Sequence, residues 1–320
     1  MIKLQTKLRK VAVIGTGFVG TSYAYALMNQ SLVNELVLID LNEAKADGEA
    51  RDLNHGMPFV EPVRIKAGGY QECEDADLVV ITAGANQKPG ETRLDLAAKN
   101  ASIFKGVVEQ VMSHRFNGIF LIATNPVDIL THVTRKISGL PKHRVIGSGT
   151  SLDTARFQYL LSEHLAIDPR DIHAYIIGEH GDSSLPVWSQ ARIGGVPLQT
   201  YLNMEDIDNN QDMIAIYEGA RDAAYDIIQR KGATYYGIAL GLVRLTKALF
   251  QNENAIIPVS AHLEGEYGLH DICIGVPAVL NEQGVREVLT LELSPSEQQK
   301  LQHSAEIIRE MTRTAMTAVR

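Results

Sequence analysis

A single histidine stands between charged residues at the end of an apolar run, in the segment IIGEHGD (residues 176–182). Histidine is the side chain whose unperturbed pKa, about 6.5, lies nearest to neutral pH, so His180 could transfer a proton. A lone histidine is more often an ordinary polar residue at the end of a strand. The assignment of a proton donor therefore depends on a carboxylate that holds the imidazole in one tautomer and stabilises its charged form.

The segment SLDTARFQYLL (151–161) contains a suitable carboxylate. In a helix, Asp153 and Arg156 are three residues apart and share one face. Such a helix could present a carboxylate to His180 and a guanidinium to a ligand, because the planar fork of arginine matches a carboxylate with two parallel hydrogen bonds. A surface ion pair between Asp153 and Arg156 is the common alternative.

Two more polar residues follow strand-like segments. Arg93 ends the segment GANQKPGETR (84–93), whose glycines and proline indicate a loop. Loops after the strands of a parallel sheet gather at its carboxyl edge, where ligands bind, and a guanidinium on a closing loop would polarise a substrate carbonyl and exclude water. Asn125, just before PVD (126–128), could hydrogen-bond the substrate oxygen, and a role in a strand-end turn is the competing interpretation.

A glycine pattern near the N-terminus predicts a dinucleotide site. Gly15, Gly17 and Gly20 form G-x-G-x-x-G between a strand-like run and a helical pattern, and Asp40 lies 20 residues beyond the last glycine. At that spacing an acidic side chain accepts hydrogen bonds from a ribose, while the helix N-terminus attracts the pyrophosphate. A carboxylate would repel a 2′-phosphate, so NAD is favoured over NADP. A strand-turn-helix without a ligand is the alternative.

Strand-length apolar runs alternate with amphipathic helical patterns over the first 150 residues, which is typical of a parallel sheet covered on both faces. The second half mixes the two kinds of pattern. The expected strands are 10–15, 35–40, 77–84, 118–125, 172–178, 255–268 and 271–293 (with turn residues inside it), and the expected helices are 18–30, 43–55, 93–114, 211–231, 233–250 and 295–318. The sequence thus predicts an α/β fold. An N-terminal Rossmann domain with a doubly wound parallel sheet (1–149) binds NAD, and a mixed α+β catalytic domain (150–320) follows.

Composition limits the classes of partner. The 320 residues are 45% hydrophobic and 21% charged, as in ordinary globular proteins, and the net charge of −8 argues against a nucleic-acid-binding face. Cys73 and Cys273 are far apart and outside any C-x-x-C pair, so neither a disulfide framework nor a metal site is expected. Glycines interrupt the apolar run after the basic N-terminal residues, and no uninterrupted apolar segment of about 20 residues exists. We therefore expect a cytoplasmic protein without a membrane partner.

Six motifs occur in a fixed order: GTGFVG, ANQKPGETRLDL, ATNPVD, GSGTSLDTARF, GEHGD and KGATYYG. In these motifs the chain resembles the L-lactate dehydrogenases of bacteria, within the lactate/malate dehydrogenase superfamily, from about residue 9 to the C-terminal helix. The resemblance implies an NAD-dependent interconversion of L-lactate and pyruvate, in glycolysis and pyruvate fermentation, by an allosteric homotetramer.

The resemblance also implies residue roles. His180 would be the acid and base, with Asp153 as its partner, and Arg93 would polarise the carbonyl. The implied substrate contacts are Gln87, Arg93, Asn125, Arg156 and Thr234. The implied cofactor contacts are Gly15, Gly17, Val19, Gly20, Asp40, Lys45, Tyr70, Gly84, Ala85, Thr124, Asn125 and Ser148.

The substrate depends on Gln87. The malate branch of the superfamily carries arginine at the matching position, where it pairs with a second carboxylate. A neutral glutamine would leave that charge unpaired in a closed site, at a cost of a few kcal/mol, which favours pyruvate over oxaloacetate. A malate or other 2-hydroxy acid dehydrogenase is the alternative enzyme, and an NAD-binding sensor on the same fold is the alternative outside catalysis.

An effector site is expected to be weakened. Bacterial relatives often bind fructose 1,6-bisphosphate between subunits through an arginine two residues after the substrate arginine and a histidine before GEHGD. His173 matches the histidine, but Gln158 stands at the arginine position. Glutamine brings no charge to a phosphate, so we expect little dependence on this effector unless another basic residue, such as Arg170, compensates.

Overall fold

The structure is a computed structural model that describes residues 8–85, 90 and 92–319. Its helices are α1 (Phe18–Met28), α2 (Glu43–His55), α3 (Arg93–Ser113), α4 (Val127–Ser138), α5 (Ser151–Leu165), α6 (Leu198–Tyr201), α7 (Gln211–Lys231), α8 (Tyr236–Phe250) and α9 (Pro295–Ala318). Its strands are β1 (Lys10–Ile14), β2 (Glu35–Ile39), β3 (Arg64–Ala67), β4 (Leu78–Ile81), β5 (Ile119–Ile122), β6 (Val145–Gly147), β7 (Ile172–His173), β8 (Ile176–Ile177), β9 (Leu185–Pro186), β10 (Arg192–Ile193), β11 (Val196–Pro197), β12 (Ala255–Glu264), β13 (His270–Asn281) and β14 (Gly284–Val288).

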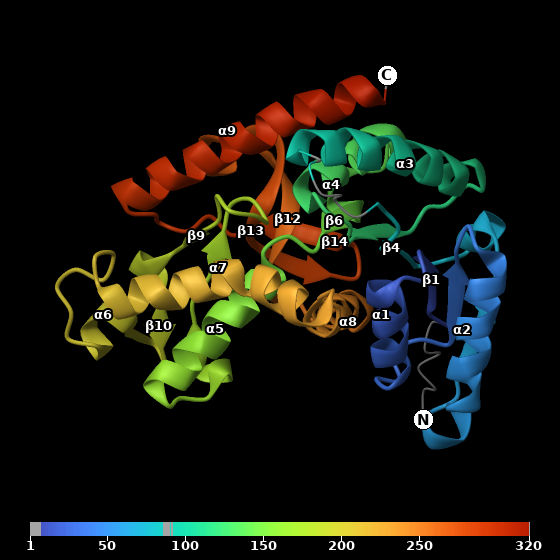
Figure 1. The fold of residues 1–320 in the computed structure, drawn as a ribbon, viewed down its shortest axis with the longest axis horizontal. Helices are drawn as coiled ribbons and strands as arrows, with labels where there is room; N and C mark the ends of the chain where they lie inside the picture. Colours follow the sequence, from blue (N-terminus) through green and yellow to red (C-terminus); the bar gives the residue numbers. More distant parts are fainter. Residues whose placement is uncertain (1–7, 86–89, 91, 320) are drawn as a thin grey trace, which may run out of the picture.

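Within the described part of the chain, nine strands form one sheet in the order β14-β13-β12-β6-β5-β4-β1-β2-β3 (Figure 1). The six strands from β1 to β6 run parallel to one another. Their order in space, β3-β2-β1-β4-β5-β6, is that of the doubly wound dinucleotide-binding fold. The predicted fold class is confirmed.

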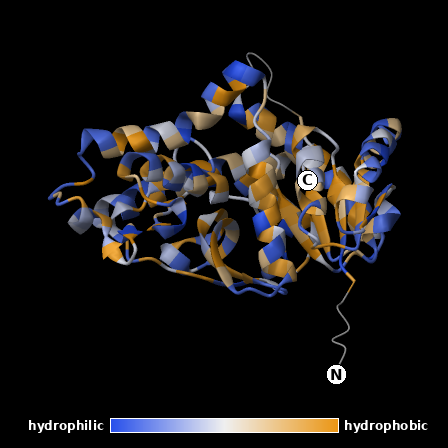
Figure 2. Cartoon of the chain, turned by 90° about the horizontal axis from the view of Figure 1, so that it is seen from below, coloured by the Kyte–Doolittle hydropathy of each residue, from blue (hydrophilic) through white to orange (hydrophobic). Residues whose placement is uncertain are grey.

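Helices cover both faces of the parallel strands, because successive strand residues point to opposite sides. Val11 and Val13 of β1 pack with α1 and α8 on one face, whereas Ala12 and Ile14 pack with α3 and α4 on the other. Figure 2 shows the result, with hydrophobic strands inside and hydrophilic residues on the outer helices. Among the described residues, no helix has both the length and the apolar character needed to span a bilayer.

The winding of the sheet reverses between β1 and β4. In such sheets the turns after the two central strands open a crevice at the carboxyl edge, which is where ligands bind. The two turns are tied together here, since the backbone N–H groups of Thr82 and Ala83 each donate to the carbonyl of Ile14 at 2.9 Å. Gly15 therefore lies beside the chain that leads to Gly84.

The second half extends the same sheet. Strands β12, β13 and β14 are antiparallel neighbours, and β12 joins β6 through Ser260 and Gly147. Helices α5 and α7 with the short strands β7 and β10 surround a separate core around Phe157, Trp188 and Met213. This half is mixed α+β as predicted, but its long strands continue the parallel sheet and do not form a sheet of their own.

Several described elements are absent from the sequence-based prediction, namely β3, β6, β9, β10, β11, α4 and α6. Strands β3 and β6 have only four and three residues, too few to show a periodic pattern. In α4 the polar residues Thr131, His132 and Thr134 are buried, and both threonine hydroxyls donate at 2.7 Å to carbonyls four residues earlier. The sequence of α4 nevertheless carries an apolar stripe at helical spacing, with Ile129, Leu130 and Val133 buried, and the sequence-based prediction overlooked it.

The junction between the two halves depends on Gly149. Its φ is +51°, and a β-carbon there would lie 2.6 Å from the carbonyl carbon of Val259 and closer still to the nitrogen of Ser260. Gly149→Ala should lower the free energy of unfolding by about 3 kcal/mol or more, because backbone cannot move aside without breaking the β6–β12 junction. Urea unfolding at fixed protein concentration measures the change.

Gly139→Ala is the matched control. Gly139 also has a positive φ, +64°, but no described atom lies within 4 Å of an added β-carbon. This variant should lose only about 1 kcal/mol, the cost of a left-handed alanine. Equal losses in the two variants would contradict the steric argument.

Candidate active site

His180 and Asp153 form a short, buried hydrogen bond. Nδ1 of His180 lies 2.6 Å from Oδ2 of Asp153. Asp153 is in the first turn of α5 with 7% of its surface exposed, and His180 follows strand β8. The predicted pairing of these two residues, 27 positions apart, is present in the structure.

Charge and burial set the protonation of this pair. Burial by itself lowers the pKa of His180, but the neighbouring carboxylate of Asp153 outweighs it, so the pKa of His180 is raised above its usual value. Burial likewise raises the pKa of Asp153, but the imidazole and the guanidinium of Arg156 outweigh that effect and the pKa is lowered. The arrangement favours an imidazolium next to a carboxylate.

A second carboxylate, on Asp128, holds the backbone at the histidine. Oδ2 of Asp128 accepts a hydrogen bond of 2.8 Å from the backbone N–H of His180. Asp128 is 1% exposed, and burial raises its pKa to about 6. Sequence reasoning missed this residue, although an aspartate in the first helical turn after Asn125 was a visible signal.

Arg156 contacts Asp153 from the other side. Its Nη1 lies 3.3 Å from Oδ1 of Asp153, and the two side chains are 13% and 9% exposed. The ion pair that the sequence allowed thus exists, but it lies within the site and not on the surface. A guanidinium has five N–H donors, so this contact leaves most of them for a ligand.

Thr234 lies in the turn between α7 and α8 and is half-buried. Helix α8 begins beside the first turn of α5, since a β-carbon added to Gly237 would lie 3.0 Å from Cδ1 of Leu152. The predicted substrate threonine therefore lies near the helix that carries Asp153 and Arg156.

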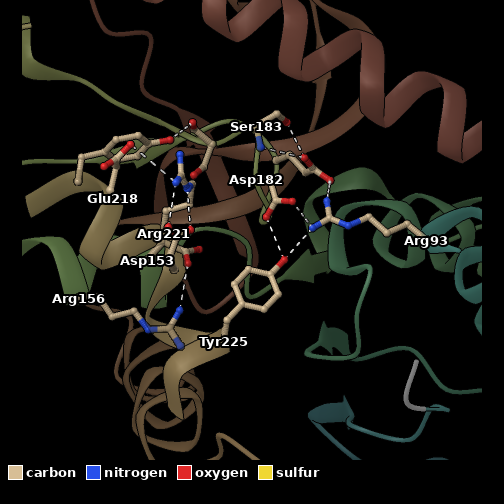
Figure 3. A network of polar contacts seen from close by, with 12 residues as sticks. Arg93, Asp153, Arg156, Asp182, Ser183, Glu218, Arg221 and Tyr225 are labelled. Carbon is tan, nitrogen blue, oxygen red and sulfur yellow. Dashed lines mark hydrogen bonds and ion pairs between the residues drawn. The ribbon is translucent and has the colours of Figure 1, made fainter. Parts of the chain in front are cut away.

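Arg93 is held by residues that the sequence analysis did not single out. It is the first residue of α3, after a capping box of Thr92 and Asp95, and not part of a free loop. Its Nη2 donates to Oδ2 of Asp182 at 2.5 Å and to the hydroxyl of Tyr225 at 2.9 Å (Figure 3). Tyr225 also donates to Oδ1 of Asp182 at 3.0 Å, which closes a three-membered network between α3, the loop after β8 and α7.

Buried polar residues order the loop around His180. The carboxylate of Glu179 accepts a hydrogen bond from the hydroxyl of Ser183 at 2.5 Å and lies 3.9 Å from Nη1 of Arg93. The backbone N–H of Glu179 donates to the hydroxyl of Ser304 on α9 at 2.7 Å. The charged neighbours of the histidine are thus fixed from α3 and α9.

Asn125 lies three residues beyond the end of β5 and is exposed. Its backbone carbonyl accepts a hydrogen bond of 2.8 Å from the side chain of Asn100, which also bonds both backbone groups of Ala85. Asn100 is fully buried on α3 and was not predicted. It fixes two of the predicted contact residues relative to each other. Gln87 lies outside the described residues.

The first turn has the shape that a dinucleotide needs. A β-carbon on Gly20 would collide with the carbonyl of Gly15, whereas one on Gly17, the N-cap of α1, would meet no described atom within 4 Å. Backbone thus packs tightly at Gly15 and Gly20, and space is open at Gly17, where a phosphate would approach the helix N-terminus.

Asp40 is oriented toward this turn. Its Oδ2 accepts hydrogen bonds from the backbone N–H and the hydroxyl of Thr16 at 2.7 and 2.9 Å, and its Oδ1 accepts one from Asn42. Burial raises the pKa of Asp40, but these hydrogen bonds outweigh it, so the pKa is lowered. An ionised carboxylate with a free acceptor position fits a ribose diol, and the residues present fit NAD.

Comparison with known proteins agrees with this geometry. Residues 9–147 match the NAD-binding domain of lactate/malate dehydrogenase, and residues 150–318 match the α/β C-terminal domain of the same family. The chain belongs to the lactate/malate dehydrogenase family. The predicted family resemblance, the NAD cofactor and the assignment to NAD-dependent oxidoreductases are confirmed.

Individual members of the lactate/malate dehydrogenase family are close relatives. The chain is 62% identical over 304 residues to an L-lactate dehydrogenase of Priestia megaterium, with 95% of this chain and 96% of that protein covered. An L-lactate dehydrogenase of Geobacillus sp. (strain WCH70) is 59% identical, with coverage of 95% and 96%. The crystal structure of the minor L-lactate dehydrogenase from Enterococcus mundtii in its ligands-bound form is 50% identical with a TM-score of 0.93, and 96% of this chain and 98% of that chain are covered.

The other predicted cofactor residues are distributed around the crevice. Val19, Tyr70 and Ala85 are half-buried, Lys45 and Gly84 are exposed, and Thr124 and Ser148 are buried. The hydroxyl of Thr124 donates to the carbonyl of Ala83 at 2.8 Å, so its proton is not available to a cofactor.

The two residues of the predicted effector site lie on the neighbouring elements α5 and β7. The side-chain amide of Gln158 donates to the carbonyl of Ala174 at 3.2 Å, beside the exposed His173. The guanidinium of Arg170, the possible substitute for the missing arginine, forms two hydrogen bonds with Asp168, at 2.9 and 2.6 Å.

The His180–Asp153 pair predicts a defined pH dependence. Because Asp153 raises the pKa of His180, the imidazole stays protonated to higher pH and can donate a proton to a carbonyl. Asp153→Asn should lower that pKa, so the alkaline fall of pyruvate reduction should move to lower pH and kcat/KM at pH 7 should drop by about 100-fold or more. Oxidation of lactate, which needs the neutral imidazole, should lose less.

His180→Asn is the companion variant. It should abolish the pH-dependent limb, reduce turnover by about 100-fold or more and leave NADH binding, measured by fluorescence, unchanged. An unshifted pH profile in Asp153→Asn, or near-normal turnover in His180→Asn, would contradict the assignment.

Proposed function

We propose that the chain is an NAD-dependent L-lactate dehydrogenase that interconverts L-lactate and pyruvate. The observation that carries the proposal is the 2.6 Å contact between His180 and Asp153, with Arg156 on the same carboxylate. Together these groups offer a proton and a guanidinium within one buried site, as a 2-keto acid requires. The names of the relatives from Priestia megaterium and Geobacillus support the same substrate.

When NADH is bound, it supplies the hydride. The chain supplies the proton. Because Nδ1 of His180 is engaged by Asp153, Nε2 is the atom left to donate a proton to the substrate carbonyl oxygen. Asp153 keeps its negative charge and stabilises the imidazolium before transfer. In the reverse direction Nε2 accepts the proton from the hydroxyl of lactate.

The substrate carboxylate is bound by Arg156 and Thr234 in this proposal. Arg156 is anchored by Asp153 through Nη1, and its remaining donors can form parallel hydrogen bonds to a carboxylate. Arg93 and Asn125 bind and polarise the carbonyl oxygen. To reach it, the Arg93 guanidinium exchanges part of its contact with Asp182 and Tyr225 for the substrate, which makes this network a support for a movable group.

We assign the NAD site to the residues of the crevice that the resemblance implied, with a domain boundary between residues 149 and 150. The lowered pKa of Asp40 and the open space at Gly17 support this assignment. Lys45 lies close enough to Asp40 to contribute to that lowered pKa, which suits a pair of residues at one ribose.

We extend the proposal to the oligomeric state of the protein and its cellular compartment. Large apolar side chains are exposed on α1 and α8, among them Tyr25, Tyr236 and Leu240 at 62%, 64% and 61%. Such surface suits contact with further copies of the chain, and we propose a homotetramer. Cys73 and Cys273 are buried free thiols, which fits a reducing compartment such as the cytoplasm.

The direct test of the proposed reaction is the loss of NADH absorbance with pyruvate, compared with oxaloacetate at equal concentration. Pyruvate should be the better substrate. Gln87→Arg should then shift the ratio of kcat/KM values toward oxaloacetate by about 1,000-fold, because an arginine would pair with the second carboxylate that glutamine leaves unpaired. Gln87→Asn, which adds no charge, is the control. A ratio that hardly moves in Gln87→Arg would mean that residue 87 does not contact the substrate.

Fructose 1,6-bisphosphate should have little effect on the unmodified enzyme. Gln158 offers a neutral amide, Arg170 is paired with Asp168, and a charge-assisted bond to phosphate contributes about 1.5–3 kcal/mol that this site lacks. Gln158→Arg should create or strengthen a fall in the KM for pyruvate at millimolar effector, and Gln158→Lys tests whether charge alone suffices. A large fall in KM in the unmodified protein would show the prediction wrong.

A further inference from the structure

We propose that His132, His262 and Asp271 form a binding site for a divalent transition-metal ion of the zinc class. The three residues come from α4 and from the neighbouring strands β12 and β13, which follow α4 by more than a hundred residues of sequence. One atom from each, a ring nitrogen from either histidine and a carboxylate oxygen from the aspartate, lies within 4.8 Å of the other two. The site is outside the catalytic residues described above.

The geometry fits zinc after a small adjustment. Zn²⁺ binds imidazole nitrogen and carboxylate oxygen at about 2.0–2.2 Å in a tetrahedron, so its ligand atoms lie about 3.3 Å apart. Nε2 of His262 is already 3.1 Å from Oδ1 of Asp271. The other ligand atoms lie within 4.8 Å of one another, so these distances would have to shorten for all three residues to bind one ion.

Nδ1 of His132 is buried and has no hydrogen-bond partner among the described residues, and the residue is 5% exposed. An unsatisfied buried polar atom costs about 1–3 kcal/mol, so a ligand at this nitrogen would stabilise the structure. Nδ1 of His262 also lacks a partner there, but it lies across the ring from Nε2, the atom that faces Asp271. The two ring centroids are 6.1 Å apart.

The donor set also suits this class of metal. Two imidazole nitrogens and one carboxylate oxygen are ligand types that zinc takes in proteins.

Two positively charged side chains next to Asp271 would repel a metal ion. Nη2 of Arg135 and Nζ of Lys136 lie 2.9 and 3.0 Å from Oδ1 of Asp271. Their repulsion weakens binding, and a metal must share or displace their contact with the carboxylate. Lys136 is 37% exposed and can turn into solvent, whereas the Arg135 side chain is more buried, at 19%. The proposal therefore predicts that removing Lys136 tightens metal binding.

A metal here would fasten α4 to the β12–β13 hairpin. Asp128, one turn before His132 on α4, holds the backbone of His180. Asn125 lies just ahead of the same helix. The expected role is thus structural, by fixing the helix that supports the catalytic loop. The sequence argument against a metal considered cysteines alone and could not join residues from these three elements.

The test is zinc binding to the full-length protein after treatment with a chelator. Isothermal titration with Zn²⁺ should give one site per chain, and Co²⁺ should give the visible d–d absorption of a tetrahedral site. Asp271→Asn and His132→Gln should each weaken binding at least about 10-fold, whereas Lys136→Ala should tighten it by about 10-fold. Asn tolerates the φ of +48° at position 271, so Asp271→Asn preserves the backbone.

Matched controls remove an exposed histidine and an exposed lysine elsewhere. His303→Gln and Lys300→Ala, both on α9, should leave zinc affinity unchanged. A saturating excess of zinc should also raise the unfolding temperature of the unmodified protein by about 5 °C, but not that of Asp271→Asn.

Absence of stoichiometric binding would overturn the proposal. Binding that survives both Asp271→Asn and His132→Gln would overturn it as well, because the metal would then lie elsewhere, for example at His180. Lys136→Ala with unchanged or weaker affinity would show that the ion does not contact Asp271. None of these outcomes depends on whether the enzyme prefers pyruvate.

Discussion

The hydrogen bond between His180 and Asp153 is the constraint on which the site depends. The side chains of His180 and Asp153 are 22% and 9% exposed, and each is stabilised in its charged form by the other, 2.6 Å away. The distance is fixed by the next residue, Thr154, whose hydroxyl accepts from the backbone N–H of Ile176 at 3.0 Å and donates to its carbonyl. Helix α5 and strand β8 are thus held in one register, and the position of His180 follows from it.

Charge around this pair is balanced by groups on separate elements. Arg156 contacts Asp153 through the oxygen that His180 does not use, and Asp128 lies behind the histidine with a raised pKa of about 6. A second full cation beside the imidazole would lower its pKa, and the added carboxylate offsets that effect. The site can therefore hold a guanidinium for the substrate without giving up an imidazolium at neutral pH.

Sequence reasoning succeeded where the signal is local. The glycine turn, the apolar strands around it and the capping box of α9 each depend on a few adjacent residues. All three features are present in the structure. His180 and Asp153 could be paired because both lie in recognisable motifs. Asp182, Tyr225 and Asn100 could not be found in this way, because their contacts join residues 89, 132 and 25 positions apart and depend on how helices pack.

The continuous sheet fixes the relative positions of site residues that come from the two halves of the chain. In the proposed function, a ligand at the carboxyl edge would meet Asp40 and Gly17 from the first half and His180 and Arg156 from the second. Small relative movements of the halves would then misplace a hydride donor against a proton donor. Strand β12 continues the hydrogen-bonded order of β6, and Gly149 lets the chain leave that sheet and enter α5 two residues later. The same junction that joins the halves thus begins the helix that carries Asp153. Since Arg93 at the start of α3 contacts Asp182 and Tyr225, the two halves are also joined across the site by this network.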